Sequence, residues 1–232
     1  SIDPSGRVTA SGMLANGVGA DLWVRRYSAE GAPLWTLTYD PDLKSFFPFA
    51  AKVAARPDGR AVVGYRERAA DNTGPELVFE VPEGGGAPAW TMPLPGTDGT
   101  VQGIALAANG DVVVSVSTLI EGGLTLAVRR LDPAGSPLWT SVACTGTNGR
   151  DVAIDPVDGS VVVVGDGVAV DSNIRLCKLS ADGALLWGQE IDGGAGDDYG
   201  RSVAISPDRR IVVAGIVDGA GGTDAWVAAF AP

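Results

Sequence analysis

One short phrase built around a tryptophan recurs along the chain and constrains its fold more than any other feature. It reads Leu34-Trp35-Thr36, Ala89-Trp90-Thr91, Leu138-Trp139-Thr140 and Leu186-Trp187-Gly188. Successive tryptophans are 55, 49 and 48 residues apart. A period near 50 residues is typical of proteins that stack similar supersecondary units, and a β-propeller is the architecture in which each such unit is a small antiparallel sheet.

A turn recurs with the same period as the tryptophan phrase. Its copies are Asp3-Pro4-Ser5-Gly6-Arg7, Arg56-Pro57-Asp58-Gly59-Arg60, Ala107-Ala108-Asn109-Gly110-Asp111, Asp155-Pro156-Val157-Asp158-Gly159 and Ser206-Pro207-Asp208-Arg209-Arg210. Proline presets φ for such a turn, Asp or Asn caps it, and glycine accepts a left-handed exit, so the carboxylates here are structural. Arg209 replaces the glycine in the last copy, and a left-handed backbone there would be strained by about 1 kcal/mol.

Four strands are predicted in each unit of about 50 residues. A valine-rich run such as Val161–Val164 follows each turn and reads as a strand that is buried on both faces. In propeller geometry the strand that precedes the turn, for example Ser202–Ser206, lines the central channel. The tryptophan strand is then outermost, and we expect its ring to pack between neighbouring blades.

The fold class that follows is all-β, a β-propeller of four-stranded antiparallel blades. We predict a single domain over residues 1–232, with repeats at approximately 1–50, 51–101, 102–150, 151–201 and 202–232. The first and last units each lack one strand. The sequence therefore predicts five blades with one incomplete, or alternatively a piece of a larger propeller.

Composition excludes several classes of function. The formal net charge is −11, which disfavours binding to nucleic acid. Histidine is absent, so His-dependent triads and His-ligated zinc are excluded. We expect no cofactor, and no apolar run is long enough for a membrane span. Cys144 and Cys177 are either two buried thiols or a disulfide, and a disulfide would indicate an oxidising compartment.

The repeats resemble a family of bacterial β-propeller repeats. The stretch Gly196-Asp197-Asp198-Tyr199-Gly200-Arg201-Ser202-Val203-Ala204-Ile205 is similar to the start of that repeat, and Asp224-Ala225-Trp226-Val227 to its later half. Units two and three depart from it, because Thr97-Asp98-Gly99 and Thr147-Asn148-Gly149 replace the Asp-Asp-Tyr loop. The resemblance implies secreted or surface-attached bacterial proteins without a common chemistry. A weaker resemblance to quinoprotein-type propeller repeats is confined to Leu131–Trp139.

Loops at one end of the channel are where we expect a ligand to bind. The predicted ligand-binding residues are Asp98, Asn148, Arg150, Asp197, Asp198, Tyr199 and Arg201. A second polar set, which includes Asp166 and Asn173, lies at the same end of the channel, in the loops that connect the two middle strands of each unit. No metal site is predicted, although Asp192, Asp197 and Asp198 form an acidic, glycine-rich calcium candidate. Phe46, Phe47 and Phe49 form an aromatic cluster that would mark a partner surface if it is exposed.

The function predicted from the sequence is a non-enzymatic extracellular, cell-surface or periplasmic scaffold that presents loops to a protein or glycan partner. The absence of histidine and the differences between the loops of the repeats favour such a scaffold over an enzyme. The first alternative is a carbohydrate-active enzyme that uses paired carboxylates at the channel mouth, such as Asp98, Asp197 and Asp198. The second is a subunit that docks into a larger assembly through open edge strands.

Overall fold

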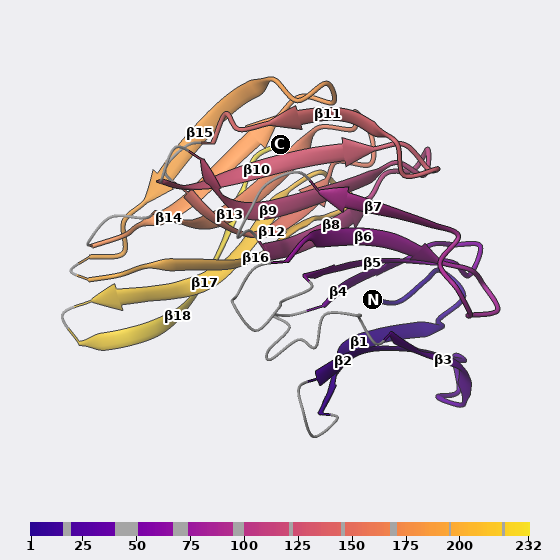
Figure 1. The fold of residues 1–232 in the computed structure, drawn as a ribbon. Coiled ribbons are helices and arrows are strands. Elements are labelled where there is room, and N and C mark those ends of the chain that lie inside the picture. Colours follow the sequence, from indigo (N-terminus) through magenta and orange to yellow (C-terminus); the bar gives the residue numbers. More distant parts are fainter. Residues whose placement is uncertain are drawn as a thin grey trace.

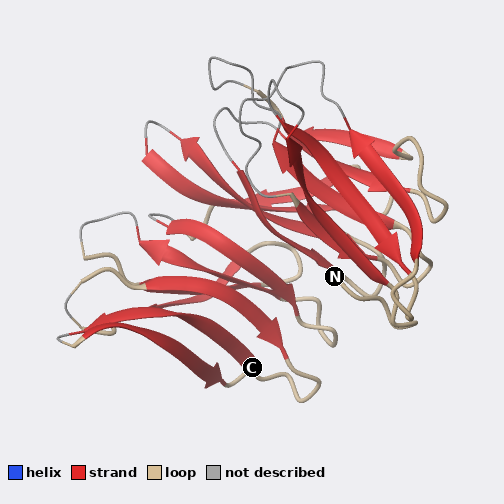
Figure 2. Ribbon diagram, turned by 90° about the horizontal axis from the view of Figure 1, so that it is seen from below, coloured by secondary structure: helices blue, strands red, loops and turns tan. Residues whose placement is uncertain are grey.

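The computed structural model describes residues 1–15, 20–39, 51–66, 74–94, 100–120, 123–144, 147–167, 171–194, 196–219 and 221–232. These residues form five antiparallel sheets, and none of them is helical (Figures 1 and 2). The fold class predicted from the sequence is therefore confirmed, as an all-β, propeller-like architecture. The described residues contain no helix of the length and apolar character that crossing a lipid bilayer requires.

The sheets follow the sequence repeats. Sheet one contains β1 (Val8–Ala15), β2 (Ala20–Tyr27) and β3 (Pro33–Tyr39). Sheet two contains β4 (Lys52–Ala55), β5 (Ala61–Arg66), β6 (Glu76–Val81) and β7 (Trp90–Leu94), and sheet three β8 (Thr100–Leu106), β9 (Val112–Ile120), β10 (Gly123–Leu131) and β11 (Pro137–Ser141). Sheet four contains β12 (Thr147–Ile154), β13 (Val161–Gly167), β14 (Ile174–Leu179) and β15 (Leu185–Ile191), and sheet five β16 (Tyr199–Ile205), β17 (Ile211–Gly219) and β18 (Gly222–Phe230).

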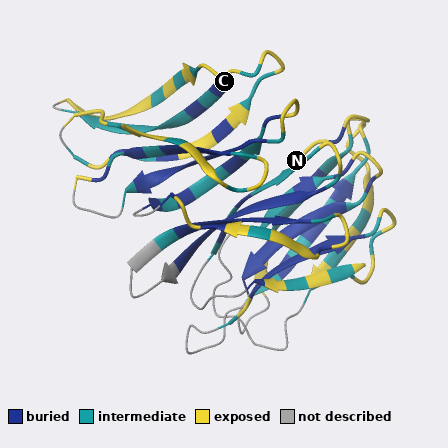
Figure 3. Ribbon diagram, turned by 90° about the horizontal axis from the view of Figure 1, so that it is seen from above, coloured by how far each residue is buried: buried dark blue, intermediate teal, exposed yellow. Residues whose placement is uncertain are grey.

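Successive sheets pack face to face in an arc, with sheets one and five at its two ends (Figure 1). The strands that precede the turns contact one another from sheet to sheet, β4 with β8, β8 with β12 and β12 with β16. They are therefore the innermost strands, as predicted. A separate apolar cluster lies between each pair of neighbouring sheets. As a result β5 is buried along its whole length, whereas β1 in the first sheet is only half-buried (Figure 3).

The tryptophans pack between sheets, as the sequence predicted. A Cβ placed on Gly135, in the turn that precedes β11, would lie 2.5 Å from the ring of Trp90 in the preceding sheet. Trp139 lies in the same way against Gly183 of sheet four, and its indole N–H donates to the Ala181 carbonyl at 3.0 Å. Because only glycine leaves room for the ring, the tryptophan phrase and the glycine turn of the next unit form one packing element.

A buried ion pair recurs at the turn end of the sheets, and its polarity is reversed in sheet two. In sheet one Arg26, which is fully buried, contacts the carboxylate of Asp3 in the turn. In sheet two Glu80 occupies the same position, opposite the tryptophan of its sheet, and binds Arg56 of the turn. Arg56 also donates to the Gly110 carbonyl of sheet three at 2.6 Å, so the pair joins two sheets.

Arg209 adopts the left-handed backbone that its glycine counterparts adopt, with φ of 67°. Its side chain reaches back to sheet four, where Nε donates to Asp155 at 2.8 Å and the guanidinium also contacts Asp158. The strain expected from the sequence is thus present. The ion pair with Asp155, whose side chain is buried, offsets it.

Candidate functional site

The loop face is the end of the propeller at which the chain enters the innermost strands, opposite the Asp-Pro turns. On this face Arg150 of β12 forms a bidentate ion pair with Asp166 of β13, with nitrogen–oxygen distances of 2.6 and 2.9 Å. The Asn148 amide lies 3.4 Å from the same carboxylate, and its oxygen accepts a hydrogen bond from Ser117 of sheet three. Sheets three and four are thus joined by a chain of polar groups.

Sheet five adds an aromatic ring to this face. The Tyr199 hydroxyl donates to Asp197 at 3.3 Å, and the guanidinium of Arg201 lies over the Tyr199 ring, 4.8 Å from its centre. The ring is half-exposed, and both Asp197 and Arg201 are exposed. Asp197 raises the pKa of Tyr199, and Asp166 adds to this shift. We call this group the Tyr199 cluster, and it consists of Asn148, Arg150, Asp166, Asp197, Tyr199 and Arg201.

Asp197 and Asp198 are adjacent in the sequence, but Asp197 is exposed and Asp198 is buried. Asp197 accepts hydrogen bonds from the backbone and hydroxyl of Ser172, and the backbone bond is the main cause of its lowered pKa. Asp198 is completely buried, and its two oxygens accept the backbone N–H groups of Gly193 and Asp218. Asp198 therefore stabilises the loop that carries Asp197, and it is not available to a ligand or as half of a catalytic pair.

The calcium candidate consists of carboxylates that already bind backbone amides. Asp192 accepts the Gly194 N–H at 2.8 Å, and Asp197 and Asp198 are engaged as described. Across the described ranges, no three acidic or cysteine side chains are grouped closely enough to hold a metal ion. These residues are better explained as the hydrogen-bond acceptors of a tight loop.

Five of the predicted ligand-binding residues lie in the Tyr199 cluster, and Asp198 lies beneath it. Asp98 and the aromatic residues Phe46, Phe47 and Phe49 lie outside the described residues. Asp166 belongs to the second polar set that the sequence places at this end of the channel, although it was not among the predicted ligand-binding residues. Ser172 was in neither set.

A buried carboxyl group between sheets two and three was also missed. Glu76 begins β6 and is 4% exposed, and burial raises its pKa to about 7, although Arg66 and Arg129 oppose the shift. A glutamate at the start of a strand is usually exposed to solvent, so nothing in the sequence predicted that Glu76 is buried. A carboxyl group that titrates near neutrality is a functional-site candidate and a determinant of pH-dependent stability.

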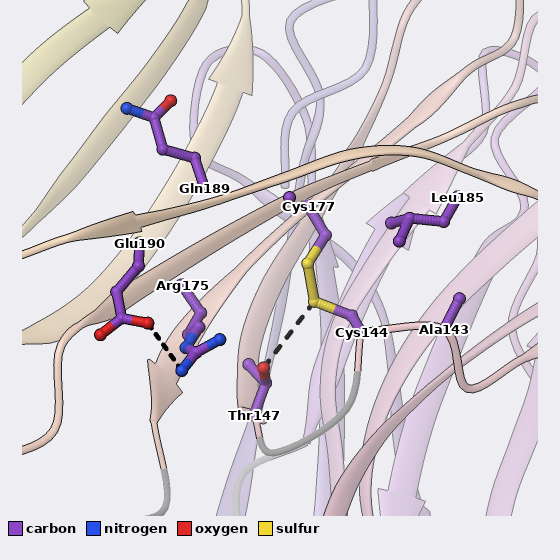
Figure 4. Close-up of a pocket in the computed structure, with 9 residues that line it drawn as sticks. Ala143, Cys144, Thr147, Arg175, Cys177, Leu185, Gln189 and Glu190 are labelled. Carbon is purple, nitrogen blue, oxygen red and sulfur yellow. Dashed lines mark hydrogen bonds and ion pairs between the residues drawn. A yellow bond between two sulfur atoms is a disulfide. The ribbon is translucent and has the colours of Figure 1, made fainter.

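A pocket of about 350 Å³ lies at the outer side of sheet four (Figure 4). A disulfide between Cys144, in the connection from β11 to β12, and Cys177 of β14 forms part of its wall, with a Cα–Cα distance of 6.3 Å. The alternative of two buried thiols is therefore wrong. Arg175 and Glu190 line the pocket as an ion pair at 2.7 Å, so its charges are already compensated.

Comparison with known proteins identifies a fold and no family. No protein-family model matches the chain, and no curated protein matches it in sequence. A Dyadobacter fermentans protein of unknown function is similar in structure, with a TM-score of 0.69 and 10% identity over 97% of this chain and 76% of that one. A Synechocystis apocarotenoid oxygenase has a TM-score of 0.58 and 11% sequence identity over 97% of this chain. A Xanthomonas campestris gluconolactonase has a TM-score of 0.52 and 15% sequence identity over 84% of this chain. This chain spans 57% and 65% of these two enzymes.

These similarities overturn the functional prediction. A non-enzymatic scaffold was inferred from the propeller repeats and the missing histidine, yet proteins of the same fold include an oxygenase and a gluconolactonase. The prediction of a non-enzymatic scaffold is therefore wrong, because neither the fold nor the lack of histidine separates scaffolds from enzymes. At 10–15% identity the similarity shows the fold alone.

Proposed function

We propose that the chain binds a carbohydrate on the loop face of sheets four and five, through the Tyr199 cluster. The observation that carries the proposal is the stack of the half-exposed Tyr199 ring and the exposed Arg201 guanidinium, with Asp197 hydrogen-bonded at its edge. Flat aromatic and guanidinium surfaces pack against the C–H faces of sugar rings.

The polar groups around the stack match the hydroxyl groups of a sugar. Each hydroxyl both donates and accepts, so a site for vicinal hydroxyls needs neighbouring donors and acceptors. Arg150 supplies N–H donors that its bidentate pairing with Asp166 holds in a fixed position, and Asp166 itself is buried. Asp197 supplies a carboxylate that its lowered pKa keeps ionised at neutral pH.

An extracellular, cell-surface or periplasmic location belongs to the same proposal. The Cys144–Cys177 disulfide supports it, because disulfides persist mainly in oxidising compartments. The resemblance of residues 196–205 to bacterial propeller repeats, which are typical of secreted or surface-attached proteins, points the same way.

Isothermal titration with a panel of neutral and acidic oligosaccharides tests the proposal. We expect Tyr199→Ala to lower the affinity about tenfold or more, since it removes the ring, and Tyr199→Phe to lower it less. Trp23→Ala is the matched control, because Trp23 also lies under an arginine, Arg25 at 5.2 Å, but far from the cluster in sheet one. Equal losses in the Tyr199 and Trp23 variants, or no binding by the wild type, would contradict the proposal.

The same incubations should be analysed for reaction products by mass spectrometry. Glycoside hydrolysis needs one carboxylic acid that stays protonated near neutral pH beside a second carboxylate. Asp197, with its lowered pKa, is unsuited to the first role. The proposal therefore concerns binding, and product formation dependent on Tyr199 would extend it to catalysis.

A further inference from the structure

The repeats place Arg150 and Arg201 at the same position in successive sheets. The register of β12 against β13 shifts at Arg150, and the register of β16 against β17 shifts at Arg201. Each arginine is thus the extra residue of a β-bulge on an innermost strand. One position of the fold therefore carries the same side chain twice, and differences between the two copies arise from their surroundings.

The two copies differ in the residue that compensates the guanidinium. In sheet four Asn148 pairs in register with Asp166, whose carboxylate binds Arg150 through both oxygens. In sheet five Tyr199 pairs in register with Ile216, which therefore holds the position of Asp166. An isoleucine side chain carries no charge and accepts no hydrogen bond.

Arg201 is consequently an exposed cation without a carboxylate partner in the described part of the chain. Its guanidinium carbon lies over the Tyr199 ring, 4.8 Å from the ring centre, and among the described residues its N–H groups form no hydrogen bond or ion pair. Such a guanidinium is suited to bind an anion supplied by a ligand.

We infer that Arg201 is the receptor for the carboxylate of an acidic carbohydrate, a uronic acid, and this inference rests on the proposed function. A carboxylate matches the fork of a guanidinium with two parallel hydrogen bonds, as Asp166 does for Arg150. The ligand carboxylate then supplies to Arg201 the two acceptor oxygens that Asp166 supplies to Arg150. Tyr199 and Asp197 contact the ring and hydroxyls of the same sugar residue.

Oligogalacturonate and its methyl ester form the test pair, because they share one backbone and differ only at the carboxyl group, where esterification replaces the negative charge with a methyl group. We expect wild type to bind the acid about tenfold more tightly than the ester in isothermal titration. Arg201→Gln removes the cation, and Ile216→Asp supplies the internal carboxylate that sheet four has. Both variants should bind the two ligands equally. Ile216→Asp, which leaves the guanidinium over the Tyr199 ring, should keep the wild-type affinity for the ester, whereas Arg201→Gln should bind the ester more weakly because it removes part of the surface that packs against the sugar. Equal affinity of wild type for both ligands, or a preference that survives in Arg201→Gln, would overturn the inference.

A second readout separates this inference from the proposed function. Acetate, titrated into protein with ¹⁵N-labelled arginine, should shift the Arg201 side-chain Nε–Hε resonance in wild type and leave it unmoved in Ile216→Asp. A Tyr199-dependent affinity for neutral sugars without an acid preference or an acetate shift would refute the inference and leave the proposed function standing. An acetate shift without any carbohydrate binding would support Arg201 as a carboxylate receptor and refute the proposed function.

Discussion

The repeated turn differs between units in the residue that occupies its left-handed position. Four turns place a glycine in the left-handed region, and the fifth places Arg209 there at φ of 67°. The arginine is retained at a backbone cost because its side chain reaches Asp155 and Asp158 of the preceding sheet. Local strain and an ion pair between sheets are thus coupled in one residue.

Whether Arg209→Gly lowers or raises the free energy of unfolding should depend on whether its partner carboxylates are present. In the wild type we expect a loss of about 1 kcal/mol in the free energy of unfolding, because the lost ion pair to buried Asp155 outweighs the relieved strain. In an Asp155→Asn/Asp158→Asn background the same substitution should stabilise by about 1 kcal/mol, because only the strain remains. Urea unfolding of the four proteins measures both values, and the same sign in both backgrounds would contradict the coupling.

The candidate site was only partly predictable at this scale. The equivalence of Arg150 and Arg201 follows from the repeat alone. The contact between Arg150 and Asp166 does not follow from it, because the bulge at each arginine, which the repeat pattern does not mark, determines which side chain of the next strand lies alongside. The opposite roles of Asp197 and Asp198 were equally hidden, since adjacent residues of an irregular loop have no fixed alternation of direction.

At the scale of the strands, the tryptophan phrase and the glycine turn act together. Gly85, Gly135 and Gly183 each lie under the tryptophan of the preceding sheet. Gly31 has the same left-handed backbone, with φ of 86°, but no atom lies within 4 Å of a Cβ placed there. Gly31 is therefore a control for the contact between the turn glycine and the tryptophan.

Gly135→Ala should destabilise the protein more than Gly31→Ala. Both variants force alanine into a left-handed conformation, which costs about 1 kcal/mol. Only Gly135→Ala drives a methyl group into the Trp90 ring, which adds about 1–3 kcal/mol of overpacking. Urea midpoints at unchanged m-value measure the difference, and equal losses would show that Trp90 yields without cost.

For the molecule as a whole, periodicity alone was enough to predict the architecture. The order of strands within a sheet, the inner and outer positions and the packing of Trp90 follow from a period near 50 and from alternating burial. The ionic contacts between residues of neighbouring sheets could not be predicted from this periodicity. Glu76 shares its environment with Arg129 of the next sheet, a residue more than 50 positions away in the sequence. Such pairs depend on how two sheets are offset, which no repeat pattern encodes.

Glu76 should make the global stability fall as pH rises. Its pKa is about 7 in the folded protein and 4.5 when unperturbed, so between these values the folded state holds a proton that the unfolded state has lost. The contribution is present below about pH 4.5 and is lost by about pH 7, and it amounts to about 3 kcal/mol. Unfolding free energies measured from pH 5 to 8 should decline in wild type and stay nearly flat in Glu76→Gln. An identical slope in the variant would assign the decline to other groups.

The reversed ion pair of sheet two has a consequence for how the chain finds its fold. Similar neighbouring repeats can exchange strands during folding, and such misassembly is a characteristic failure of repeat proteins. If the turn of sheet two paired with the middle strands of sheet one, Arg56 would meet Arg26, and in the reverse exchange Asp3 would meet Glu80. Two like charges would then be buried together, at a cost of several kcal/mol. The reversed sign in sheet two thus disfavours an exchange of strands between sheets one and two, although the strands of the two sheets have nearly the same shape.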